Sequence, residues 1–169
     1  MILTLHSGAQ PGAAAPVLVA TINGIKTILQ AKAAVDLKVI EWGINFSGFA
    51  AAAPPVIELL DTYTAAATMT TATAEADVGK IGSLGGLAAD YLTLGTTATG
   101  FNSGGTENSG TITNWHLKDG PKQLPPSGSY EKMFSLGQEP VLWKGNVLRI
   151  RVTAVAIYSV HAWMKLAPN

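Results

Sequence analysis

The feature that constrains this chain most is an alternation of apolar and polar residues with a period of two. Within residues 37–46, Ile40, Trp42, Ile44 and Phe46 all fall on one side of an extended chain. Successive side chains of a β-strand point to opposite faces, so this segment is predicted to be a strand with one apolar face. The chain has no long segment with the 3.6-residue period of an amphipathic helix.

Two hairpins are predicted from the same alternation. Asn23-Gly24 separates two apolar runs within residues 17–30, and this dipeptide is typical of a two-residue turn between paired strands. Near the end of the chain, residues 148–153 and 157–165 alternate on both sides of a join near Ala154, which predicts a closing hairpin.

Further short strands are expected at residues 56–61, in the threonine-rich segment 64–77, and at 111–117. Many short strands separated by glycine and proline favour an all-β fold, and about eight of them fit a jelly-roll-like antiparallel β-sandwich. Residues 17–169 are predicted to form this single domain. Residues 1–16, which end in the aperiodic run "SGAQPGAAAP", are predicted to be an extended arm that reaches a neighbouring molecule.

Charge is unusually scarce. Charged residues make up 13% of the 169 residues, whereas soluble domains carry roughly 25%. A surface so poor in charge associates readily, so we expect other subunits to cover much of it. The formal net charge of zero gives no reason to expect nucleic acid as a partner. No apolar run reaches the roughly 18 residues of a membrane span, and no membrane partner is expected.

Catalytic and metal-binding patterns are weak. The chain has no cysteine, and its histidines, at positions 6, 116 and 161, lack the spacing of metal ligands. Glu41 and Glu58 can be arranged as a glycosidase pair, but salt-bridged strand faces are the favoured reading. Arg149 and Arg151 are likewise expected to pair with carboxylates of a neighbouring strand or subunit rather than to grip phosphate. No enzyme activity, cofactor or metal is predicted.

The candidate functional residues are instead contact residues. The segment "WHLKDGPKQLPPSGSYEK", residues 115–132, has turn composition and is interpreted as a long loop that touches another subunit. Tryptophans are typical anchors of interfaces, and they also form platforms on which sugars stack. The predicted contact set is Trp115, His116, Lys118, Asp119, Lys122, Trp143, His161 and Trp163.

Five short motifs follow one another along the chain: "KTILQ", "VIEWGINF", "LGTTATG", "LGQEP" and "LRIRV". They lie within residues 25–62 and 92–155, over half of the chain. In this order they resemble a family of small virion proteins of tailed bacteriophages, and residues 63–91 match nothing in that pattern.

The resemblance implies a capsid decoration, or cement, protein with a jelly-roll-like fold. Such a protein sits on the outside of an icosahedral head, commonly as a homotrimer, and binds the major capsid protein. It is made in the cytoplasm of the host bacterium and ends on the virion. The alternative is a receptor- or glycan-binding module of a phage head or tail fibre, for which host-surface glycan is the partner.

Overall fold

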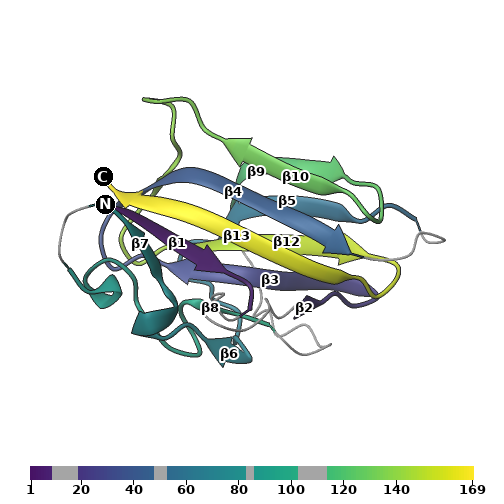
Figure 1. The fold of residues 1–169 in the computed structure, drawn as a ribbon, viewed down its shortest axis with the longest axis horizontal. Coiled ribbons are helices and arrows are strands. Elements are labelled where there is room, and N and C mark those ends of the chain that lie inside the picture. Colours follow the sequence, from purple (N-terminus) through teal and green to yellow (C-terminus); the bar gives the residue numbers. More distant parts are fainter. Residues whose placement is uncertain (9–18, 48–52, 83–85, 103–113) are drawn as a thin grey trace.

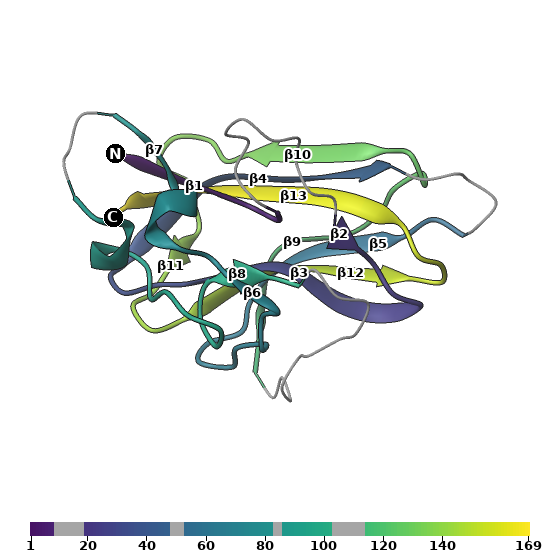
Figure 2. The same cartoon turned by 60° about the horizontal axis from the view of Figure 1, so that its bottom comes forward.

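The computed structural model describes residues 1–8, 19–47, 53–82, 86–102 and 114–169. Two antiparallel sheets pack face to face, which makes the fold an all-β sandwich (Figures 1 and 2). The central path of the first sheet contains β10 (Ser129–Met133), β4 (Leu37–Ser47), β13 (Ser159–Pro168), β1 (Ile2–His6) and β7 (Gly79–Ile81). Beside this path, β11 (Val141–Leu142) pairs with β4, and β2 (Val19–Ala20) pairs with β13.

The second sheet contains, in order, β6 (Thr71–Ala72), β8 (Gly100–Phe101), β3 (Gly24–Lys32), β12 (Val147–Ala154), β5 (Val56–Asp61) and β9 (His116–Gln123). Two short 3-10 helices, Glu75–Asp77 and Ala88–Asp90, lie between β6 and β8 in the chain. No helix in the described part of the chain is long and apolar enough to span a membrane.

The main strands pair in a nested order. The first main strand pairs with the last, β1 with β13, and the next pairs inward are β3 with β12, β4 with β10, and β5 with β9. Apart from β5 and β9, successive main strands lie in opposite sheets. A long hairpin rolled up in this way is a jelly roll, so the predicted fold class is confirmed.

The core lies between the two sheets and follows the predicted alternation. Trp42, Ile44 and Phe46 are buried on β4, as predicted. Ile40 is only half-buried, because the pairing with β13 shifts between Lys165 and Leu166 and leaves Ile40 without a partner there. Because of this extra residue, Val39 points into the core in place of Ile40, and Val39 is fully buried.

The described start of the chain is part of the sandwich, which corrects the predicted arm. Ile2–His6 form β1, which pairs with β13 on one side and with β7 on the other. Leu3 and Leu5 are completely buried, so this segment contributes to the core rather than to contacts with a neighbour. The rest of the predicted arm, residues 9–16, lies outside the described residues.

Neither predicted hairpin forms, although the strands themselves do. β2 and β3 flank Asn23, but β2 belongs to the first sheet and β3 to the second. β12 and β13 are separated in the same way by the connection through Val155. In both places the chain crosses between the sheets, because an alternating strand buries its apolar face equally well against the opposite sheet.

The segment predicted to be a long loop is mostly strand. Residues 116–123 form β9 at the edge of the second sheet, and residues 129–133 form β10 at the edge of the first. Only residues 124–128 connect them, so the segment closes one side of the sandwich. Residues 63–91, which match nothing in the phage-family pattern, include β6 and β7, which extend the opposite edges of the two sheets. Of the strand predicted within residues 64–77, only Thr71–Ala72 forms, as β6.

Candidate functional site

The predicted contact residues do not form one site. Most of them divide into three clusters, which we call the Asp119 cluster, the Asp61 cluster and the histidine row. Among the described residues there is no enclosed pocket, and no group of three or more His, Cys, Asp or Glu side chains is placed to hold a metal ion.

The Asp119 cluster contains Trp42, Asp119, Lys122 and Tyr130. One carboxylate oxygen of Asp119, on β9, accepts hydrogen bonds from the Trp42 indole N–H at 3.1 Å and from the Tyr130 hydroxyl at 2.7 Å. The Lys122 ammonium lies 3.6 Å from the other oxygen and 5.2 Å from the centre of the Tyr130 ring. Burial and the adjacent Asp119 raise the pKa of Tyr130, so its hydroxyl stays a donor.

These bonds join β9 of the second sheet to β4 and β10 of the first. Asp119 was predicted to contact another subunit, but its carboxylate points into the molecule and its side chain is only 14% exposed. Its observed role is to fasten the two sheets together at their edge.

The Asp61 cluster contains Asp61, Tyr63, His116, Lys118 and Asn146. The buried Asp61 carboxylate accepts bonds from the backbone N–H of Tyr63 at 3.0 Å and from the Asn146 amide at 3.1 Å, and the Lys118 ammonium lies 3.4 Å away. The Tyr63 hydroxyl lies 2.9 Å from Nε2 of His116, with the ring centres 5.1 Å apart. His116 and Lys118 are thus held by side chains of the same chain.

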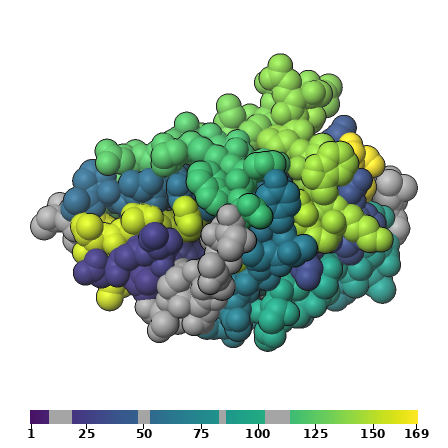
Figure 3. Space-filling view, turned by 180° about the vertical axis from the view of Figure 1, so that it is seen from behind, coloured from purple at the N-terminus to yellow at the C-terminus, as the bar shows by residue number. Residues whose placement is uncertain are grey.

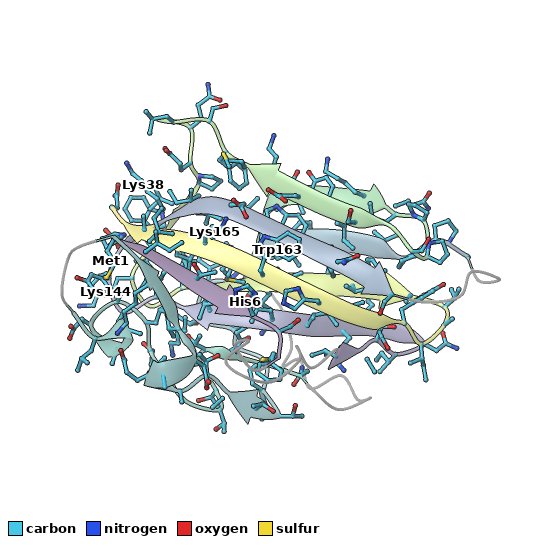
Figure 4. The ribbon with its side chains drawn as sticks, viewed as in Figure 1. Met1, His6, Lys38, Lys144, Trp163 and Lys165 are labelled. Carbon is cyan, nitrogen blue, oxygen red and sulfur yellow. The ribbon has the colours of Figure 1, made fainter. Side chains whose placement is uncertain are left out.

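The histidine row lies on the outer face of the first sheet and contains His6, His161, Trp163, Glu41 and Lys165. Figure 4 shows His6, Trp163 and Lys165 on the neighbouring strands β1 and β13. Nδ1 of His6 is 3.2 Å from Nε2 of His161, and their ring planes are within 19° of parallel. The Trp163 ring also stacks on His161, and the centres of these two rings are 5.8 Å apart.

Glu41 fixes the row at one end. Its carboxylate accepts a bond from the Trp163 indole N–H at 2.9 Å and one from the Lys165 ammonium at 2.8 Å. The Trp163 ring lies over Gly43, where a Cβ atom would be only 2.2 Å from its Cζ2. The tryptophan therefore lies flat on the sheet because the facing residue has no side chain.

Burial shifts the titration of both histidines. It lowers the pKa of His6 to about 4, with smaller contributions from His161 and Lys165, and it lowers the pKa of His161. Both rings are therefore neutral at pH 7.

We expect this pair to make folding sensitive to acid. The folded state holds the His6 pKa below its ordinary 6.5, so between pH 6.5 and 4 the unfolded chain binds more protons and the folded state loses stability as pH falls. Both rings are partly exposed, so we expect the loss to be about 1–2 kcal/mol rather than the full shift. Urea unfolding at pH 7.5 and 4.5 measures it. Between the same two pH values, the double variant His6→Gln/His161→Gln should lose about 1–2 kcal/mol less stability than the unaltered protein. Equal losses in both proteins would contradict the assignment.

Two further ion pairs link neighbouring strands within a sheet. Arg151 bonds to Glu58 at 2.8 Å across β12 and β5, so the predicted pairing of this arginine with a neighbouring strand is confirmed. Glu41 pairs with Lys165 on the first sheet, whereas Glu58 belongs to the second. These two carboxylates therefore have separate cationic partners.

The most exposed large apolar side chain in the described residues, Leu136, lies on a loop between β10 and β11. This loop, residues 134–140, stands out from the sandwich in Figures 1 and 3. Leu136 is 97% exposed at its tip. The tip is a defined turn, because the N–H of Gln138 bonds to the carbonyl of Ser135 at 2.9 Å and Gly137 has φ 82°. We call it the Leu136 loop.

The opposite end of the sandwich also exposes apolar side chains. Ile157 is 73% exposed and Val155 59% exposed in the connection between β12 and β13.

Trp115 and Trp143, two predicted contact residues outside the three clusters, are 51% and 56% exposed. Large apolar side chains left this accessible are available to a partner.

Sequence reasoning placed some of these residues correctly and missed others. The alternation along residues 158–165 put His161, Trp163 and Lys165 on the face opposite Val160, Ala162 and Met164, and the four inward residues from Tyr158 to Met164 are buried as predicted. His6 was missed as a neighbour of His161. The alternation of "ILTLH" is the signal that identifies β1 and places His6 on its outer face.

Comparison of the chain with protein-family models, curated proteins and solved structures finds no match. The class that its own strand order defines is an antiparallel jelly-roll sandwich.

Proposed function

We propose that this chain is a non-enzymatic structural protein of a bacteriophage virion, a decoration protein that binds the outside of the icosahedral head. The observation that carries the proposal is the Leu136 loop. A leucine that is exposed on an ordered, projecting turn gains free energy if it inserts into an apolar socket of a partner. The "LGQEP" motif of the phage-family resemblance forms the tip of this same loop.

The partner in this proposal is the major capsid protein, with further contacts between copies of the chain in a homotrimer. The low charge content of the chain supports a surface that is covered both by the capsid and by other copies of the chain. A protein that binds only the assembled shell stabilises that state by mass action. A trimer multiplies weak individual contacts through their high effective concentration.

The test is reconstitution on particles that lack this protein. Purified protein is added to such heads, and the bound copies are counted after sedimentation. Saturable binding of hundreds of copies, together with a higher disruption temperature of the heads, supports decoration. A handful of copies at one vertex or on the tail, or no binding, contradicts it.

The Leu136 loop gives a directed prediction. Leu136→Asp should weaken binding to the head by at least about thirty-fold, the effect of an interface hot spot of 2 kcal/mol, because the charge must enter an apolar socket. The fold should be unaffected, since the side chain is almost fully exposed.

Ile157→Asp is the matched control, because Ile157 is also exposed but lies at the other end of the sandwich. It should bind heads like the unaltered protein. Equal binding by Leu136→Asp would remove the loop from the interface, and a selective loss in Ile157→Asp would mean that the opposite end faces the shell.

A glycan-binding module of a head or tail fibre is the second candidate. The observation in its favour is that Trp115 and Trp143 expose about half of their side chains, so aromatic faces are accessible for stacking on sugar rings. Binding of the isolated protein to a glycan array, lost in Trp115→Ala or Trp143→Ala, would favour this candidate. An array without signal would rule against it.

A further inference from the structure

His6 and His161 place two ring nitrogens side by side on the outer face of the first sheet. Their 3.2 Å separation is the feature of interest, because both nitrogens carry a lone pair when they are unprotonated. With metal–nitrogen bonds of about 2.0–2.1 Å, nitrogens this far apart enclose an angle of roughly 100–106° at the metal. That angle lies between the octahedral and tetrahedral values.

Each ring can bind a metal through the nitrogen that faces the other ring. Imidazole ligates a metal through an unprotonated nitrogen, and each neutral ring has one. A neutral ring has one proton, so binding through these two atoms places the proton of His6 on Nε2 and that of His161 on Nδ1. The hydrogen bond between the rings is then replaced by two bonds to the metal.

The surroundings tolerate a cation. Lys165, whose positive charge acts on His6, is paired with Glu41 at 2.8 Å, so the pair is neutral as a whole. Trp163 stacks on His161 and is itself held by the bond of its indole N–H to Glu41, which limits the motion of the His161 ring. A site whose ligands are already oriented loses less entropy when the metal binds.

We propose that His6 and His161 form a binding site for a divalent transition metal that prefers imidazole, namely Ni²⁺, Cu²⁺ or Zn²⁺. The protein supplies two ligands, and water completes the coordination. A bound metal ties the N-terminal strand β1 to β13 on the face opposite the core contacts of Leu3 and Leu5. The inference does not depend on the proposed function.

Calorimetric titration of the untagged protein with Ni²⁺ at pH 7.5 tests the site. We expect one equivalent to bind, with an affinity at least about ten-fold lower in His6→Gln and in His161→Gln. His116→Gln is the matched control, because it removes the remaining histidine of the chain and should leave the titration unchanged. Binding only above 1 mM, equal binding in all variants, or a loss confined to His116→Gln would overturn the proposal.

A second measurement needs no variant and so does not depend on how well the variants fold. In a proton spectrum of the unaltered protein, substoichiometric Cu²⁺ should broaden the ring signals of His6 and His161 before those of His116. Ni²⁺ should also raise the melting temperature, because it binds the folded state and ties β1 to β13. Uniform broadening of all three histidines, or an unchanged melting temperature at saturating Ni²⁺, would count against the site.

Discussion

Replacing Asp119 with alanine should lower the free energy of unfolding by about 2–4 kcal/mol, because it removes one acceptor from two bonds between the sheets. The indole N–H of Trp42 would lose its partner in a residue that is completely buried. The Tyr130 hydroxyl would lose the same partner. A buried donor that is left unsatisfied costs its full desolvation energy, so the loss exceeds that of an ordinary exposed hydrogen bond. Urea unfolding at pH 7.5 measures the change.

Lys122→Ala is the matched control for this variant. The Lys122 ammonium is 3.6 Å from the Asp119 carboxylate and its side chain is 39% exposed, so its removal should cost less than about 0.5 kcal/mol. Asp119→Asn keeps an acceptor oxygen and should fall between the two. If Asp119→Ala is no more destabilising than Lys122→Ala, the bonds to Trp42 and Tyr130 do not hold the sheets together.

This result would change how an attachment experiment is interpreted. The composition of residues 115–132 suggested a contact loop, for which simultaneous alanine replacement of Lys118, Asp119 and Lys122 is the natural test. In the observed fold, Asp119 and Lys118 bond to side chains of the same chain. A loss of attachment in the triple variant would therefore be explained by a weakened sandwich and would not identify an interface.

The strands were predictable because they depend on a local pattern. Alternation identified β4, β12 and β13 and the faces they bury, since one apolar face suffices to place a strand on a core. The partner of each strand was not predictable in the same way. Asn23-Gly24 suggested a hairpin, yet β2 and β3 lie in different sheets, because both a hairpin and a crossing between sheets satisfy the same period of two.

The edge strand β9 shows why the candidate site was harder to predict than the core. Its sequence, "HLKDGPKQ", contains charges, a glycine and a proline, which resemble the composition of a loop. Edge strands tolerate such residues, and charges there discourage pairing with other chains. Asp119 is recognisable as a structural residue only when Trp42 and Tyr130 are seen beside it, and those neighbours are 77 and 11 positions away in the chain.

The Trp163 ring packs over Gly43 of the neighbouring strand, and replacing this glycine is expected to lower the stability of the fold substantially. Gly43→Ala should destabilise the fold by about 2 kcal/mol, because the new Cβ would be 2.2 Å from Cζ2 of Trp163. The ring must then leave the sheet and give up its bond to Glu41. Urea unfolding measures the loss, and a shift in tryptophan fluorescence should accompany it.

A double-mutant cycle with Trp163→Ala separates the clash from any effect of the backbone. Once the indole is absent, alanine at position 43 meets no ring, and replacing a strand glycine by alanine should be neutral or stabilising. The two substitutions should therefore be coupled by about 2 kcal/mol. If Gly43→Ala destabilises the Trp163→Ala protein as much as the unaltered one, then the backbone of β4 itself requires the glycine, and the flat position of Trp163 is not the reason for it.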